Sequence, residues 1–128
     1  MDTQISQDFV EYVEAWRERV ASQESKRQMQ AQHLREVAQV CAQRLVRDFG
    51  VSKVYLFGSL LDDELVHDRS DIDLAVEGLE GKLYFKALRD VWRLLPVGVE
   101  LDLVLLDRAW PGMAERVRTE GVLLDATA

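Results

Sequence analysis

The sequence predicts an α/β (α+β) domain, in which helices pack against a small mixed sheet. Three short apolar runs, at residues 51–57, 71–76 and 99–106, have the length and composition of strands. Segments with apolar residues at three- and four-residue steps lie before, between and after these runs, as expected of amphipathic helices. A chain of 128 residues is long enough to build one such domain around a real core.

Composition and charge narrow the class of protein. Apolar residues make up 48% and charged residues 30% of the chain, and no apolar run reaches the length of a membrane helix. The N-terminus lacks the basic start and apolar centre of a signal peptide, and the single cysteine, Cys41, falls in a helical pattern. We therefore expect a buried apolar role for Cys41 and a cytoplasmic protein. A net charge of −7 without any basic run argues against direct nucleic-acid binding.

The first 49 residues are predicted to be helical. Two apolar stripes at helical spacing indicate this: Phe9, Val13, Trp16 and Val20, then Leu34, Val37, Cys41, Leu45 and Phe49. A polar stretch over residues 21–32 separates them, so one long helix and two helices with a break near residues 22–25 both fit, and we expect two. We divide the chain into an N-terminal helical extension, residues 1–32, and a domain over residues 33–128. The first stripe either packs on this domain or forms a partner-binding face.

The remaining elements alternate between strand and helix. In chain order we expect a strand at residues 51–57, a corner at 58–59, a short helix at 60–66, a strand at 71–76, a turn at 77–81, a helix at 82–95 and a strand at 99–106. Pro111 suits the first turn of a last helix, and Gly121 suits its end. Residues 122–124 remain as a short apolar tail segment.

Two aspartates in the run at residues 71–76 form a candidate metal site. Because side chains alternate along a strand, Asp71 and Asp73 would lie on one face, about 7 Å apart, while Ile72 points into the core. Two carboxylates at this spacing repel each other unless a cation lies between them. Mg²⁺ is the natural candidate, because it prefers oxygen ligands and shares them with substrate phosphates.

Asp102 and a glycine corner extend this candidate site. An acid in so apolar a strand is costly unless it is paired or bound to metal. If the strand of Asp102 neighbours that of Asp73, three carboxylates would hold two Mg²⁺ ions, which clamp the attacking and leaving oxygens of a displacement at phosphorus. Gly58 lets the backbone approach a phosphate closely, and Ser59 opens a predicted helix whose first N–H groups face an anion.

Taken together, these motifs resemble those of the nucleotidyltransferase superfamily that includes DNA polymerase β. The motifs that carry the resemblance are Gly58-Ser59, Ser70-Asp71-Ile72-Asp73-Leu74 and Asp102. The resemblance covers about residues 34–124, and the small size is similar to that of minimal nucleotidyltransferases (MNT), the antitoxins of HEPN/MNT toxin–antitoxin pairs. It implies the polymerase β-like nucleotidyltransferase fold with an added N-terminal helix.

The resemblance also implies site residues. Asp71 and Asp73 would bind both metal ions, and Asp102 would bind the metal that activates the attacking hydroxyl and would take its proton. The nucleotide-binding residues would be Gly58 and Ser59, which hold the triphosphate of ATP, together with Ser70.

A protein adenylyltransferase activity follows from the same resemblance. AMP from ATP would pass to a hydroxyl, that of a tyrosine, on a partner HEPN toxin, and pyrophosphate would leave. Residues 60–66 are acidic and lack glycine, whereas the subgroup often has a basic, glycine-containing stretch after Gly-Ser. The alternative is therefore a catalytically weak or inactive antitoxin of this fold that neutralises its toxin by binding alone.

Overall fold

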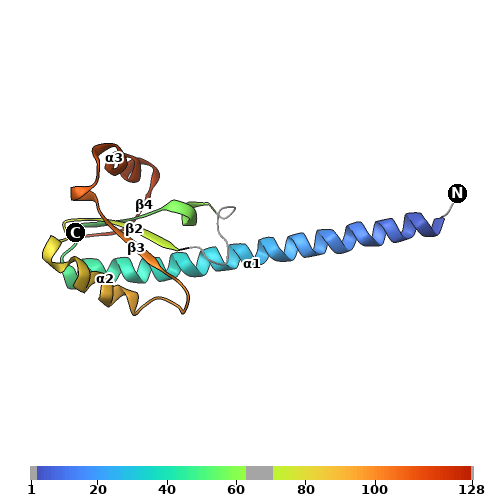
Figure 1. The fold of residues 1–128 in the computed structure, drawn as a ribbon, viewed down its shortest axis with the longest axis horizontal. Coiled ribbons are helices and arrows are strands. Elements are labelled where there is room, and N and C mark those ends of the chain that lie inside the picture. The colour runs from blue at the N-terminus through green and yellow to red at the C-terminus, as the bar shows by residue number, and fades with distance from the viewer. Residues whose placement is uncertain (1–2, 63–70, 128) are drawn as a thin grey trace.

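The computed structural model describes residues 3–62 and 71–127 as a four-stranded sheet with helices on both faces and one long helix that extends beyond it (Figure 1). The helices and strands are α1 (Thr3–Phe49), β1 (Lys53–Phe57), β2 (Ile72–Glu77), α2 (Tyr84–Trp92), β3 (Leu101–Leu105), α3 (Pro111–Glu120) and β4 (Val122–Ala126). Three short 3-10 helices join them: η1 (Gly58–Leu61), η3 (Gly81–Leu83) and η4 (Leu106–Arg108). The predicted mixed α/β class is confirmed. A search of the described residues finds no helix with the length and apolar character needed to cross a membrane.

The sheet is mixed, and its register positions the candidate site. Its strand order is β3-β2-β1-β4, with β1 antiparallel to both of its neighbours and β2 parallel to β3. A parallel pair needs a crossover connection, which α2 provides here. The pairing sets Asp73 of β2 opposite Phe57 of β1 on one side and opposite Asp102 of β3 on the other.

Alternation of side chains gives the sheet two different faces. One face packs against α1 and α2 through Val54, Leu56, Ile72, Leu74, Val76, Leu101 and Leu103. The other face packs against α3 through a smaller cluster, which comprises Tyr55, Phe57, Ala75, Val104, Leu106, Ala109, Ala114 and Val117. Figure 1 shows α3 on the opposite side of the sheet from α1 and α2. The smaller cluster leaves part of this second face open, and the aspartates lie there.

One continuous helix, α1, replaces the two that we expected, so the predicted break near residues 22–25 is wrong. The polar stretch at residues 21–32 contains no glycine or proline, and most of its residues are good helix formers. Loss of apolar periodicity therefore removes a packing surface without ending the helix. The helix ends before Gly50, whose φ of 69° is typical of a glycine C-terminal cap.

The C-terminal tail forms a strand, β4, that the sequence did not predict. It pairs antiparallel with β1 at the edge of the sheet, and Gln39 of α1 donates a hydrogen bond to the Leu124 carbonyl oxygen at 2.9 Å. Three apolar residues are too short a pattern to identify a strand, so its formation depends on the free edge of β1. The predicted helix at residues 60–66 is represented by η1, which ends at Leu61, and residues 63–66 lie outside the described residues.

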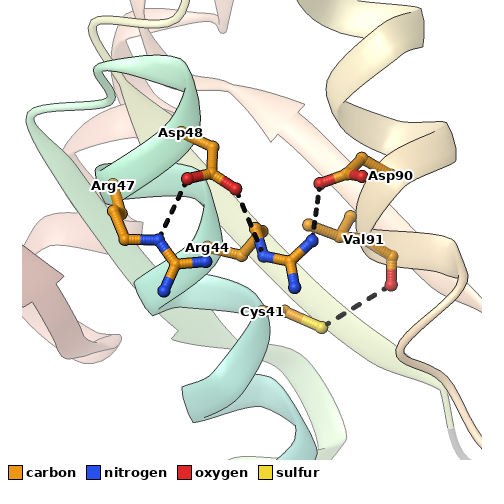
Figure 2. A network of polar contacts seen from close by, with 6 residues as sticks. All are labelled: Cys41, Arg44, Arg47, Asp48, Asp90 and Val91. Carbon is orange, nitrogen blue, oxygen red and sulfur yellow. Dashed lines mark hydrogen bonds and ion pairs between the residues drawn. The ribbon is translucent and has the colours of Figure 1, made fainter.

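Polar contacts join α1 to α2 (Figure 2). Arg44 of α1 forms ion pairs with Asp90 of α2 at 3.1 Å and with Asp48 at 3.3 Å, and Arg47 pairs with Asp48 at 3.0 Å. Cys41 lies fully buried beside them, which confirms its predicted apolar role, and burial raises the pKa of its thiol to about 11. The same helix that covers the sheet therefore also fixes α2.

Candidate active site

The three predicted aspartates gather at one end of the β2–β3 pair. Asp73 and Asp102 are register partners on neighbouring parallel strands. Ile72 is buried in the main core, so Asp73, next to it on β2, points to the opposite face. Asp71 directly precedes β2 and is exposed, and the Ile72 N–H donates to the Glu100 carbonyl oxygen at 3.0 Å, so the strands are still paired at this point. The structure therefore places the three carboxylates at one end of the strand pair, near enough for Asp102 and Asp71 to act electrostatically on Asp73.

Burial and the two neighbouring carboxylates together disfavour the charged form of Asp73. The pKa of Asp73 is raised to about 6, chiefly by burial, and further by the negative charges of Asp102 and Asp71. Within residues 3–62 and 71–127, no three acidic, histidine or cysteine side chains lie close enough together to form a ready-made metal site. The donor set nevertheless fits Mg²⁺, because it offers only carboxylate oxygens and its excess negative charge is what a divalent cation neutralises.

The Gly58 corner lies directly against the Asp73 carboxylate. Gly58 has a φ of 79°, and a Cβ at this position would overlap Oδ2 of Asp73. Both the backbone conformation and the space therefore require glycine. Arg35 of α1 donates to the Leu60 carbonyl oxygen at 2.8 Å and so ties η1 to the long helix. The exposed backbone of Gly58 therefore lies directly beside the carboxylate of a candidate metal ligand.

A groove opens at this corner, and Gly58 and Ser59 form part of its wall. Its volume is about 770 Å³, and it is lined by Phe57, Gly58, Ser59, Leu61, Met113, Arg116, Val117, Glu120 and Gly121. Among the described residues of this lining, Arg116 is the only base, and it pairs with Glu120 at 3.0 Å on the surface of α3. Sequence reasoning missed Arg116, because only the docking of α3 on the sheet brings it near the Gly58-Ser59 corner.

A second groove, of about 570 Å³, runs along β3 and is lined there by Leu103, Val104 and Leu105. Tyr84 of α2 is in its lining, and its hydroxyl donates to the Leu103 carbonyl oxygen at 2.7 Å. Burial, and next the charge of Asp102, raise the pKa of Tyr84, so the hydroxyl lies within the electrostatic reach of the site. Nothing in the sequence pattern distinguished Tyr84 from a helix residue. Ser70, the remaining predicted residue, lies outside the described residues.

Comparison with known proteins identifies the family to which the fold belongs. Residues 39–127 match the family described as "Polymerase beta, Nucleotidyltransferase". A search of curated proteins finds no significant match. The crystal structure of a toxin-antitoxin with AMP-PNP has a chain that is 28% identical, with a TM-score of 0.56 over 70% of this chain and 73% of that one.

A further solved structure is a toxin-antitoxin MntA-HpeT mutant in which two aspartates, one residue apart, are replaced by glutamate. It is 26% identical, with a TM-score of 0.54, and the match covers 70% of this chain and 73% of that chain. The matched region of the family contains every strand, the glycine corner and all three aspartates. The chain is a member of the polymerase β nucleotidyltransferase family.

Proposed function

We propose that this protein is a Mg²⁺-dependent adenylyltransferase that moves AMP from ATP to a hydroxyl, that of a tyrosine, on a partner HEPN toxin, and that it thereby acts as the antitoxin. The observation that carries this proposal is the group of three carboxylates around Asp73, placed directly beside the Gly58 corner. The similarity to a toxin-antitoxin with AMP-PNP supports both the nucleotide and the partner.

Each residue of the site has a part in this reaction. Asp71, Asp73 and Asp102 would hold two Mg²⁺ ions, which supply charge neutralisation at the phosphates and lower the pKa of the attacking hydroxyl. The hydroxyl oxygen of the acceptor forms a bond to the α-phosphorus of ATP as the bond from that phosphorus to the pyrophosphate oxygen breaks. Asp102, which is exposed at the edge strand β3, accepts the hydroxyl proton.

The groove in front of Gly58 and Ser59 suits the polyphosphate. A chain of net charge −7 with three clustered carboxylates repels ATP, so the nucleotide needs both divalent cations and a local positive charge. Arg116 is positioned to provide this charge, because it shares the groove with the corner. Its pairing with Glu120 is exposed and weak, so the guanidinium is easily released to a phosphate.

A second candidate function is neutralisation of the toxin by binding alone. The acidic stretch that begins at Leu60-Leu61-Asp62 favours it, because negative charge and the lack of glycine after the corner both oppose a triphosphate. The same MNT fold would then serve only as a docking partner.

An experiment in cells separates the two candidates. Wild type and the double variant Asp71→Asn/Asp73→Asn are expressed with the toxin, and both growth and co-purification of the toxin are measured. Transfer chemistry predicts that the variant still binds the toxin but no longer restores growth. Full protection by the double variant would favour binding and contradict the proposed chemistry.

A further inference from the structure

The N-terminal part of α1 carries an apolar stripe that the described domain does not cover. Residues 7–30 extend away from the sheet in Figure 1. We define the extension stripe as Phe9, Val13, Trp16 and Val20. Its aromatic side chains are 66% and 54% exposed at Phe9 and Trp16, and the neighbouring Tyr12 is 65% exposed. Exposed aromatic residues at regular helical spacing mark an interaction surface.

The extension stripe continues the face of α1 that packs on the sheet. At 100° per residue, its four members and the buried residues Leu34, Ala38, Cys41 and Leu45 fall within a sector of about 80°. The sheet therefore lies on the same side of α1 as the stripe. Ala31 is the first fully buried residue of the helix, so an occupant of the stripe has free space only up to about that point.

We propose that the extension stripe binds the same stripe of a second copy of this chain, in an antiparallel helix pair. In a parallel pair, the second helix would continue past residue 31 into the space that the sheet occupies. In an antiparallel pair, the second helix ends where the domain begins, and the two domains lie at opposite ends of the pair.

Side-chain sizes favour the antiparallel arrangement. We place the midpoint of the helix pair between Glu14 and Ala15 of each copy. Phe9 then lies opposite Val20 of the second copy, and Trp16 lies opposite Val13 of the second copy. Each layer then joins one aromatic ring to one valine, which fills the interface evenly. A parallel pair would place aromatic against aromatic and valine against valine. Tyr12 also comes beside Arg19 of the second copy, where a cation–π contact forms.

Charge along the extension is also complementary only in antiparallel order. Residues 7–16 carry three acids and no base, a net charge of −3. Residues 17–28 carry four bases and two acids, a net charge of +2. Antiparallel pairing sets the negative half of one helix along the positive half of the other, whereas parallel pairing sets like charges together. Sterics, layer size and charge therefore agree on the antiparallel arrangement for a second copy of this chain.

Sedimentation of the full-length chain over a concentration series tests the proposal. We expect a species of twice the 14.7 kDa of one chain. Trp16→Glu should raise the dissociation constant of the dimer at least about thirtyfold. Ala15→Glu is the matched control, because it adds the same charge one residue away on the outer side of the helix, and it should leave the dimer intact. A wild-type chain that stays monomeric, or equal effects of the two substitutions, would overturn the proposal.

Disulfide trapping tests the direction of the pair. In the antiparallel pair, position 9 lies beside position 20 of the second copy and about 16 Å along the axis from position 9 of that copy. A mixture of Phe9→Cys and Val20→Cys chains should therefore form a covalent dimer on oxidation, while Phe9→Cys alone should not. The native Cys41 is fully buried and does not interfere. Efficient cross-linking of Phe9→Cys alone would show a parallel pair and contradict the inference.

Discussion

Replacing Asp73 with asparagine should make the metal-free protein more stable while it abolishes the proposed activity. The charged form of Asp73 is disfavoured in the folded protein, because the carboxylate is partly buried and faces the negative charges of Asp102 and Asp71. Asparagine has nearly the same shape and no charge. The substitution therefore removes an unfavourable interaction that we attribute to the demands of metal binding.

The size of the expected gain in stability follows from the raised pKa of the Asp73 carboxyl. The pKa of Asp73 rises from 3.8 to about 6. A shift of about two units corresponds to about 3 kcal/mol for a fully buried group, and partial exposure of this carboxylate reduces the expected gain to roughly 1–2 kcal/mol. With a typical dependence on denaturant, the urea midpoint should rise by about 0.5–1 M at pH 7.5 in EDTA.

The difference in unfolding free energy between Asp73→Asn and wild type should grow as the pH rises. At about pH 3 and below, Asp73 is protonated in both the folded and unfolded states, so wild type and Asp73→Asn should be equally stable. The wild type then loses stability relative to the variant as the pH rises through about 4 to 6, and the difference becomes constant above about pH 7. Mg²⁺ should narrow the difference by stabilising the wild type alone.

Glu100→Gln is the matched control for Asp73→Asn. Glu100→Gln removes one exposed carboxylate at the same end of β3, and the charge of Glu100 does not contribute to the shift at Asp73. The free energy of unfolding of Glu100→Gln should differ from that of wild type by less than about 0.5 kcal/mol. If Asp73→Asn is no more stable than wild type in EDTA at pH 7.5, or if the full gain persists at pH 3, the cost of burying this carboxylate beside Asp102 and Asp71 has been misjudged.

Further predictions concern the corner, the groove and the buried thiol. Gly58→Ala should cost at least about 1–3 kcal/mol in urea unfolding, because of its positive φ and the Asp73 carboxylate, whereas Gly112→Ala, with open space around its Cα, should be neutral or stabilising. Arg116→Ala should raise the KM for ATP with little change in kcat, and equal effects of Arg118→Ala, whose side chain pairs with Glu77, would refute a specific role. Cys41 should react with a thiol reagent at pH 8 only as fast as the domain opens, and rapid labelling of the folded protein would contradict its burial.

Local sequence patterns predicted the strand residues of the site and their orientation. Alternation in Asp71-Ile72-Asp73 and around Asp102 gives the inward and outward faces directly, because a strand has a side-chain period of two. That β2 and β3 are neighbours was a condition in the sequence argument, and the parallel register of Asp73 with Asp102 confirms it. The roles of these residues in metal and nucleotide binding stay predictions.

Local sequence patterns could not predict the features that depend on contacts between distant parts of the chain. The strand β4 forms because β1 offers it a free edge, and Arg116 reaches the groove because α3 docks on the sheet. The continuity of α1 was missed because apolar periodicity reports packing, whereas the helix itself persists through residues of good propensity. The steric need for glycine at position 58 became visible only with the Asp73 carboxylate in place.

Transfer of labelled AMP to the toxin tests the proposed adenylyltransferase activity most directly. The purified chain is incubated with ATP labelled at the α-phosphate, Mg²⁺ and the cognate toxin, and the toxin is then examined for covalent label. We predict label on a toxin hydroxyl, with loss of label in EDTA, in Asp71→Asn and in Asp102→Asn, and retention of label in Glu100→Gln. A stable complex with the toxin that gives no label with any nucleoside triphosphate would contradict the account and leave a protein that acts by binding alone.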